Sequence, residues 1–374
     1  MILPGATLGV LGGGQLGRMF TVAAREMGYK VIVLDPDPMS PAAALANDHL
    51  QREYTDTEAL TSLATQCTAV TTEFENVPVA ALRLLEAQSL VRPAATAVEY
   101  TQNRIREKTF IRDCGLATAA FHPVRDVAEL DAALAQVKLP ALLKTAALGY
   151  DGKGQRLITD PTQAHIAFAE LGSVPCVLEE RIELHMELSV LLARSSRGEI
   201  AVYPLAENIH VHGILDTSIV PARTSVDIAA RADQMARTLA EQLDYCGLMA
   251  VEFFLTCDNQ LLINEIAPRP HNSGHYTLDA CVTNQFEQQV RALCGLPLGE
   301  TCLLSPVVMI NLLGDLWQAG APAWDKLLQY PNAKLHLYGK HAARPGRKMG
   351  HCNVLATEVS HALKIAERIK QALC

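Results

Sequence analysis

Two apolar runs near the middle of the chain flank the polar residues 256–260, and each run carries one glutamate, Glu252 before the break and Glu265 after it. The Asp258–Asn259 pair between the runs is typical of a tight turn that joins antiparallel strands. A two-residue turn at this pair places Glu252 directly opposite Glu265, with the Cβ atoms about 5 Å apart. Because both faces of the runs are apolar, the pattern predicts a buried strand pair rather than a surface hairpin with solvated glutamates. A different loop length would shift this register.

The first hundred residues alternate between apolar runs of strand length and amphipathic runs of helix length. Strands are expected at residues 7–11, 31–34 and 69–74, and a helix follows the first strand and ends near Met27, with Gly28 as its cap. Because this alternation is typical of β-α-β units, residues 1–100 are predicted to form a doubly wound parallel sheet.

The rest of the chain does not alternate in this way. Between residues 101 and 298, helices are predicted at 103–114, 126–137 and 227–243, and strands at 140–144, 177–182, 187–192, 200–204, 251–255 and 261–265. After residue 298 the pattern changes to short strands at 307–312, 334–338 and 350–354 and a final helix at 360–373. The expected fold class combines α/β and α+β structure, with domains at 1–100, 101–298 and 299–374.

Composition and charge limit the classes of partner. The 374 residues are 49% hydrophobic, which suffices for two or three domains with real cores. A net charge of −8 gives no electrostatic case for binding nucleic acid or an anionic membrane surface. The ten cysteines form no C-x-x-C pair, and the N-terminus lacks the features of a signal peptide. No apolar run is long enough to span a bilayer. We therefore expect a cytoplasmic protein with reduced thiols.

The opposed glutamates predict a cation site. Two carboxylates this close repel each other unless a cation lies between them. Mg²⁺ is commonly held by one or two carboxylates together with substrate phosphates. The segment that follows, residues 266–275, gathers Arg269, His271 and Asn272 in a turn fixed by two prolines and a glycine. Such groups suit an anionic substrate, although a well-capped loop would also explain them.

The glycine-rich segment after the first strand has two interpretations. Gly12, Gly14 and Gly17 fit the pattern G-x-G-x-x-G between a strand and a helix, and Asp35 ends the next strand. This is formally the dinucleotide-binding fingerprint, so an NAD-dependent oxidoreductase is one hypothesis. The start of the helix would equally attract a phosphate monoester, and glycine also serves tight packing at such turns.

Three further segments carry groups that suit phosphate or nucleotide. Residues 149–155 form a glycine-rich loop with Lys153, placed just after the strand-end Lys144. Residues 179–182 end a buried strand with groups that could accept hydrogen bonds from an adenine and a ribose. The turn at 344–351 is the densest basic cluster of an acidic chain and could hold a phosphate monoester. Each segment taken alone could be a solvated strand end or loop.

Five segments, taken in order, resemble the ATP-grasp superfamily, and within it the 5-(carboxyamino)imidazole ribonucleotide synthetases of purine synthesis. They lie at residues 12–19, 72–75, 149–155, 264–275 and 344–351, and the fourth is the most specific. The resemblance implies an ATP-grasp architecture with an N-terminal Rossmann-like domain, a central ATP-grasp domain and a small C-terminal domain.

The resemblance also assigns residues. It implies that ATP is bound by Arg104, Lys144, Gly149, Tyr150, Asp151, Gly152, Lys153, Gly154, Gln155, Glu179, Glu180, Arg181, Ile182, Glu187, His210, Asn264 and Glu265. Mg²⁺ would be held by Glu252 and Glu265. Aminoimidazole ribonucleotide would be bound by Gln15, Leu16, Glu73, Arg344 and Lys348. Bicarbonate and the reacting amine would meet Arg269, His271, Asn272, Tyr150 and Asp151, among which Asp151 and His271 are candidate proton acceptors.

The implied reaction is an ATP-dependent carboxylation. ATP would activate bicarbonate as carboxyphosphate, and the amine of aminoimidazole ribonucleotide would capture the carboxyl group while the loop at 149–155 closes as a lid. An ATP-grasp ligase with another acyl donor is the related alternative. A homodimer is expected from the resemblance alone.

Overall fold

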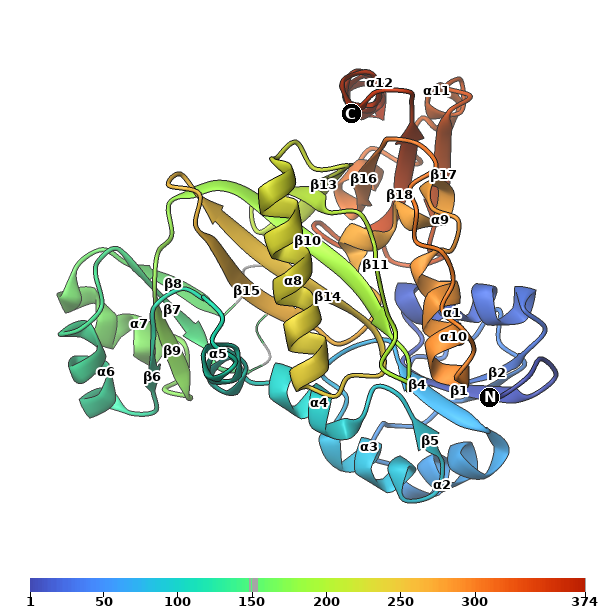
Figure 1. Cartoon of the computed structure of the whole chain (residues 1–374), viewed down its shortest axis with the longest axis horizontal. Coiled ribbons are helices and arrows are strands. Elements are labelled where there is room, and N and C mark those ends of the chain that lie inside the picture. Colours follow the sequence, from blue (N-terminus) through green and yellow to red (C-terminus); the bar gives the residue numbers. More distant parts are fainter. Residues whose placement is uncertain (148, 150–153, 374) are drawn as a thin grey trace.

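The computed structural model describes residues 1–147, 149 and 154–373, and within them the chain forms sheets of five, nine and four strands. Figure 1 shows the five-stranded sheet at the N-terminal end of the chain, the four-stranded sheet set apart at the opposite side, and the nine-stranded sheet between and above them. No helix in this described part of the chain is long and apolar enough to cross a membrane.

The N-terminal sheet is parallel throughout, as the alternating pattern predicted, and has the order β3-β2-β1-β4-β5. Its strands are β1 (Thr7–Leu11), β2 (Lys30–Leu34), β3 (Asp48–Leu50), β4 (Ala69–Thr72) and β5 (Leu90–Val91). Helices α1 (Gln15–Glu26), α2 (Thr57–Gln66), α3 (Val79–Glu86) and α4 (Ala95–Thr101) accompany them. The strand predicted to reach Phe74 ends at Thr72, so Glu73 leaves the sheet at its carboxyl edge.

The small sheet is antiparallel, with the order β6-β9-β7-β8. It consists of β6 (Phe121–Val124), β7 (Ala141–Thr145), β8 (Gln155–Ile158) and β9 (Cys176–Glu180), with α6 (Val127–Leu134) and α7 (Ala164–Glu170) packed against it. Leu143, Leu178 and Phe168 belong to an apolar core of its own. The sheet is therefore a separate lobe that carries Lys144 and Glu179 at its strand ends.

The large sheet runs β15-β14-β10-β12-β13-β16-β18-β17, and neighbouring strands along this order are antiparallel. Its strands are β10 (Leu184–Arg194), β11 (Ile200–Val202), β12 (Ala206–Val211), β13 (Ile214–Val220), β14 (Gly247–Thr256), β15 (Leu261–Ala267), β16 (Val307–Leu313), β17 (Ala333–Leu337) and β18 (Lys348–Leu355). Strand β11 pairs with β10 outside this order. The strands expected in a small third unit thus continue the central sheet through the β13–β16 pair.

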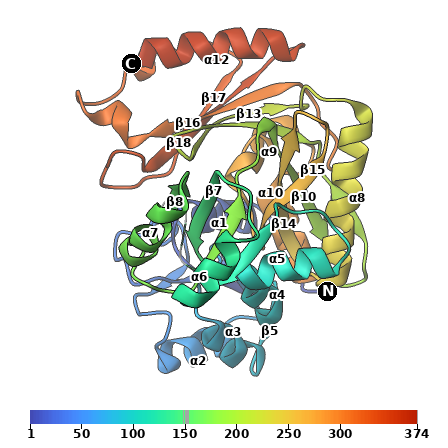
Figure 2. The same cartoon turned by 90° about the vertical axis from the view of Figure 1, so that its left-hand side faces the viewer.

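Helices on the large sheet follow from their sequence periodicity. Helix α8 (Val226–Gln242) buries Ile228, Ala232 and Ala236, spaced four residues apart, in the core above β10 and β14. Figure 1 shows it lying across these two strands. Helix α12 (Val359–Leu373) covers the other end of the sheet, as seen at the top of Figure 2. The short α9 (Thr277–Ala280) and α11 (Trp324–Leu327) complete this part.

Two helices join the sheets to one another. Helix α10 (Gln285–Cys294) buries Phe286 and Val290 in the same core as Phe20 of α1, which fixes the N-terminal unit to the large sheet. Helix α5 (Arg104–Asp113) is capped by the Asn103 side chain, which accepts from the Ile105 and Arg106 N–H groups. It lies between the small lobe and β15, so its side chains can reach both.

The glutamate hairpin has the predicted pairing but not the predicted turn. Thr256 N–H donates to Gln260 O at 3.0 Å, and Asn259 has φ +62°, which makes a three-residue loop that ends in a left-handed residue. A bulge between Glu252 and Phe253 then shifts the register by one residue, so that Glu252 opposes Glu265. The two-residue turn is therefore wrong, and the opposition of the glutamates is confirmed because the bulge compensates for the longer loop.

Candidate active site

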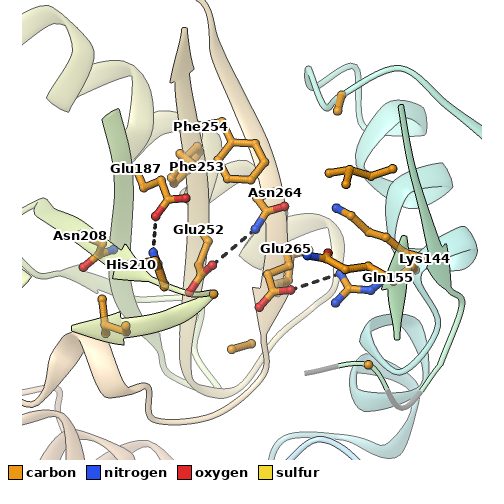
Figure 3. A pocket seen from close by; sticks show the side chains of 18 of the residues that line it. Lys144, Gln155, Glu187, Asn208, His210, Glu252, Phe253, Phe254, Asn264 and Glu265 are labelled. Atoms are coloured by element: carbon orange, nitrogen blue, oxygen red, sulfur yellow. Dashed lines mark hydrogen bonds and ion pairs between the residues drawn. The ribbon is translucent and has the colours of Figure 1, made fainter. Parts of the chain in front are cut away.

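A cleft of about 2160 Å³ lies where the three sheets meet. Its walls come from the glycine-rich segment, from the strand ends of the small lobe, from β14 and β15, and from the turn at 340–348. Figure 3 shows part of this cleft, with the glutamates of the large sheet on one side and Lys144 and Gln155 on the other.

The carboxylate wall depends on the bulge in β15. Asn264 is the extra residue, since Phe253 pairs with Ile263 and Glu252 with Glu265. As a result, Asn264 and Glu265 line the same cleft although they are consecutive residues of one strand. Asn264 Nδ2 lies 3.4 Å from Glu252 Oε2. Burial, followed by the charge of Glu265, raises the pKa of Glu252 to about 7.

Helix α5 holds the base of this wall. Arg104 Nη1 lies 3.2 Å from Glu265 Oε2, and the buried Glu107 carboxylate accepts from Ile266 N–H at 2.6 Å. Both side chains project from the same face of the helix because they are three residues apart. Arg104 therefore reaches the predicted metal ligand from the side of the predicted ATP site.

Two lysines lie on the opposite side of the cleft, Lys144 at its wall and Lys108 behind it. Lys144 Nζ lies 2.8 Å from Glu179 Oε2, and Lys108 Nζ lies 3.5 Å from Glu179 Oε1. Glu179, which was expected to meet the adenine, has its carboxylate between the two lysines, and their charges hold its pKa below the ordinary value despite burial. The sequence analysis predicted the helix at 103–114 but gave Lys108 no role in the site. Its place four residues after Arg104 was the available signal.

Glu187 and His210 form a hydrogen-bonded pair on neighbouring strands, visible at the left of Figure 3. Burial disfavours protonation of His210, but the hydrogen bond and charge of Glu187 outweigh it and raise the pKa of the imidazole. Both residues line the cleft beside Glu252. Glu187 thus fixes the orientation of the His210 ring, so that its other ring nitrogen can donate a hydrogen bond to a ligand hydroxyl.

The glycine-rich segment is closed by the protein's own carboxylates. Gly14 N–H and Gly17 N–H donate to Glu73 at 2.5 and 2.6 Å, and Gly13 N–H donates to Asp35 at 2.6 Å. A Cβ at Gly14 would overlap Glu73 Oε1. The start of α1 therefore holds a carboxylate where a dinucleotide pyrophosphate would sit, which argues against the NAD hypothesis.

The segment after β15 is held from several directions. Arg269 forms an ion pair with Glu75, and its Nη1 donates to Pro270 O at 3.0 Å. His271 Nε2 lies 3.3 Å from Glu252 Oε1, which brings this segment into contact with the carboxylate wall. Burial, with the charge of Arg269, lowers the pKa of His271 well below its ordinary value, so its imidazole is neutral at pH 7.

Asn272 is fixed by a strand of the C-terminal segment. Its side-chain amide pairs reciprocally with that of Asn311 on β16, with N–O distances of 3.0 and 2.8 Å. Asn311 Nδ2 also donates to Leu215 O at 2.7 Å. Because both asparagines are buried, the pair locks the orientation of a predicted substrate-binding amide.

Basic residues of the C-terminal segment form the far rim of the cleft. Arg344 and Lys348 line it, as does Lys340, which the sequence analysis did not single out. Lys340 Nζ donates to Gln15 and, at 2.8 Å, to Lys348 O. This contact joins the basic turn to the glycine-rich segment, so the two predicted halves of the nucleotide-substrate site lie side by side.

Not every predicted residue is placed. Tyr150, Asp151, Gly152 and Lys153 lie outside the described residues. Gly149, Gln155, Glu180, Arg181, Ile182 and Leu16 line the cleft, whereas Gly154 approaches Thr145 at the start of β8. Among the residues that the structure describes, no group of three or more His, Cys, Asp or Glu side chains is placed to hold a metal ion. A cation here would therefore need ligands from a bound substrate as well as Glu252 and Glu265.

Comparison with known proteins gives consistent matches along the chain. Family models match for a ribonucleotide synthetase preATP-grasp domain at residues 5–102, an ATP-grasp domain at 109–286 and a phosphoribosylaminoimidazole carboxylase C-terminal domain at 307–365. A protein of Bacillus subtilis (strain 168) named N5-carboxyaminoimidazole ribonucleotide synthase is 47% identical over 351 residues, which cover 94% of this chain and 92% of that protein. A protein of the same name from Brucella melitensis biotype 1 is 48% identical over 350 residues, covering 93% and 96%.

Solved structures agree. The ADP complex of an N5-carboxyaminoimidazole ribonucleotide synthetase matches with a TM-score of 0.94 and 44% identity, covering 99% of this chain and 97% of that one. An N5-carboxyaminoimidazole synthase from Aspergillus clavatus, in complex with ADP and 5-aminoimidazole ribonucleotide, matches with a TM-score of 0.91 and 32% identity, covering 98% of both chains.

Proposed function

Because the chain belongs to the N5-carboxyaminoimidazole ribonucleotide synthase family, we propose that it is the ATP-dependent ligase that carboxylates the amine of 5-aminoimidazole ribonucleotide. ATP and bicarbonate are consumed, and ADP and phosphate are released. The product contains a new bond between the amine nitrogen and the carboxyl carbon, which places the enzyme in de novo purine synthesis.

One observation carries this proposal: a single cleft is lined at one end by paired carboxylates facing Lys144 and at the other by a basic turn facing the glycine-rich segment. The first end suits a magnesium nucleotide, because its charges complement polyphosphate and cation together. The second end suits a phosphate monoester near Arg344, Lys348 and Lys340. A ligase that joins a phosphorylated nucleotide to an ATP-activated group requires both ends in one cleft.

The donor set fits Mg²⁺. Glu252 and Glu265 oppose each other across β14 and β15; burial and then the charge of Glu265 raise the pKa of Glu252, and a cation between the two would favour the ionised carboxylates. Bound there, magnesium would offset the negative charge on the phosphates. His271 Nε2 and Asn264 Nδ2 are placed to orient Glu252 from either side.

The protein groups then divide the reaction between them. Lys144 and Arg104 would hold the phosphates in line for attack by a bicarbonate oxygen on the γ-phosphorus, which releases ADP and leaves carboxyphosphate. Arg269 and Asn272 would position the carboxyl group and the amine. The amine attacks the carboxyl carbon and phosphate departs with its electron pair, with Asp151 and His271 as the candidate acceptors of the amine proton. Glu73 would meet the aminoimidazole beside Gln15.

The test is ADP release with Mg-ATP, with each co-substrate present or rigorously removed. Turnover that needs both 5-aminoimidazole ribonucleotide and bicarbonate supports the ligase. Turnover that needs the nucleotide but is indifferent to bicarbonate would overturn the carboxylation and favour another acyl donor. The Glu265→Ala variant should lose turnover while retaining its folded circular-dichroism spectrum.

We further propose that the enzyme is a cytoplasmic homodimer. The nine cysteines among the described residues are all free, which suits a reducing compartment. Cys281 and Leu303 form an isolated antiparallel β-bridge. The residues that follow them, Val282 and Leu304, are 53% and 65% exposed and form an apolar surface that a second copy could cover. Light scattering should give twice the monomer mass; a monomer at micromolar concentration would contradict the dimer.

A further inference from the structure

Two buried lysines share one carboxylate beneath the cleft. The side chains of Lys108 and Glu179 are 1% and 2% exposed, and that of Lys144 is 11% exposed. Lys108 comes from α5, Lys144 from β7 and Glu179 from β9. Lys108 Nζ also lies 3.1 Å from Thr118 Oγ1, so it is held by the protein on two sides. Of the two lysines, only Lys144 lines the cleft.

The charges of this triad do not cancel. Two ammonium groups and one carboxylate leave one net positive charge, and Lys144 is the lysine of this triad that lines the cleft. With Lys144 alone, the Glu179 carboxylate at 2.8 Å would neutralise the lysine completely. Lys108 lies 3.5 Å from Oε1 of Glu179, an ion pair without a hydrogen bond, while Lys144 donates to Oε2. Burial lowers the pKa of Lys108, and the charge of Glu179 opposes this effect, so an ammonium group at this place is held at a cost.

We infer that Lys108 is a positioning residue whose charge, shared through Glu179, keeps the charge of Lys144 available to the phosphates of ATP. Lys108 itself does not touch the nucleotide. The inference rests on the proposed function, since it requires ATP phosphates beside Lys144. It assigns a role to a residue of α5 that lies behind the wall of the cleft, not in it.

The decisive variants change the charge of the triad in known steps. Lys108→Met leaves a neutral Lys144–Glu179 pair. Lys108→Met combined with Glu179→Gln restores one net positive charge, now on Lys144 alone, without an unpaired buried carboxylate. Lys108→Arg keeps the charge. Arg112 is an exposed cation on the same helix, so Arg112→Met removes one positive charge outside the triad and serves as the matched control.

The readouts are the dissociation constants of a non-hydrolysable ATP analogue and of adenosine, measured by calorimetry with Mg²⁺, and the steady-state constants. We expect Lys108→Met to weaken binding of the analogue about 10- to 100-fold, the range set by loss of one charge-assisted contact. Adenosine binding, and the KM for aminoimidazole ribonucleotide, should change less than about threefold, since neither ligand places a polyphosphate beside Lys144. The double variant should recover most of the lost affinity, and Lys108→Arg should lie near the wild type.

A purely structural role for Lys108 gives a different pattern. The inference would be overturned if the double variant lost more affinity for the ATP analogue than Lys108→Met does, or if adenosine and the ATP analogue lost affinity equally. The comparison needs only Lys108→Met and the double variant, both of which avoid an unpaired buried charge and should fold. If the wild type shows no bicarbonate-dependent turnover, the proposed function fails; if it turns over but the double variant does not recover, the role of Lys108 alone fails.

Discussion

Replacing Glu252 by glutamine should stabilise the metal-free protein, by an amount that grows as the pH rises from about 4.5 to about 7. In the unfolded chain this carboxyl group has its ordinary pKa of 4.5, whereas in the folded protein burial and the charge of Glu265 raise the pKa to about 7. Between these values the folded state holds more protons than the unfolded state. The stability of the wild type therefore falls as the pH rises through this window, and the cost is complete above about pH 7. Glutamine never ionises and avoids that cost.

The magnitude follows from the shift. A pKa difference of about 2.5 corresponds to about 3 kcal/mol at pH 8, since each unit is worth about 1.4 kcal/mol. For a chain of this length the entropy of unfolding is about 0.8 kcal/mol per degree, so the melting temperature of Glu252→Gln should rise by about 4 °C at pH 8. At pH 5 most of the difference disappears, because Glu252 is then largely protonated in the wild type.

Thermal melts of metal-free wild type and Glu252→Gln at pH 5 and pH 8 check this, with the surface variant Glu26→Gln as the matched control. Saturating Mg²⁺ and ADP should reverse the order at pH 8, because the wild type gains a ligand-bound state that the variant lacks. An equal gain at both pH values, or a metal-free variant less stable than the wild type at pH 8, would refute the idea that ionised Glu252 destabilises the folded, metal-free protein.

Three other substitutions probe the substrate end of the cleft. Gly14→Ala introduces a Cβ that overlaps the Glu73 carboxylate, so the KM for aminoimidazole ribonucleotide should rise about tenfold or more with the KM for ATP nearly unchanged in steady-state assays. Asn311→Asp removes the hydrogen bonds that Asn311 donates to Asn272 and to Leu215 O, the first of which orients Asn272, and should raise the same KM by about tenfold, since each buried bond is worth about 1 kcal/mol and its loss leaves an acceptor unpaired. Arg344→Ala should raise that KM and also flatten its dependence on ionic strength, measured from about 50 to 300 mM salt; an unchanged salt dependence would remove Arg344 from the phosphate site.

Periodicity predicted the longer strands and helices α1, α5, α6, α8 and α12, because their buried faces repeat along the chain, but it missed shorter strands and several helices, α10 among them. Helix α8 shows this clearly, since Ile228, Ala232 and Ala236 follow a helical spacing that was visible before the structure. Strands β12 and β13 were not predicted: β12 has a half-exposed hairpin end at Ile209 and Val211, so its pattern is neither alternating nor uniformly apolar. That the C-terminal strands would join the central sheet also could not be foreseen, since strand partners far apart in sequence leave no local signal.

The candidate site was predictable where the chemistry lies within short segments, and hidden where it depends on distant contacts. Glu252 and Glu265 were found from one hairpin, even though the turn was assigned incorrectly. The contact of the Glu73 carboxylate with the glycine-rich segment was not predicted, because Glu73 reaches Gly14 from the end of a different strand. Lys108 was missed for the same reason, since its partner Glu179 comes from a strand far along the chain. The roles proposed for these residues await the experiments above.

The pairing of β13 with β16 has a consequence for synthesis of the chain on the ribosome. Strand β13 is complete at Val220, but its neighbour β16 begins only at Val307. Until those later residues emerge, the nascent protein carries an open strand edge with unpaired N–H and C=O groups, the kind of edge that recruits other chains. A messenger RNA truncated before β16 would therefore encode every predicted ATP-binding residue, and its protein product would still be prone to aggregation. The C-terminal segment therefore has two roles: it pairs with the otherwise open edge of β13, and it forms a wall of the cleft.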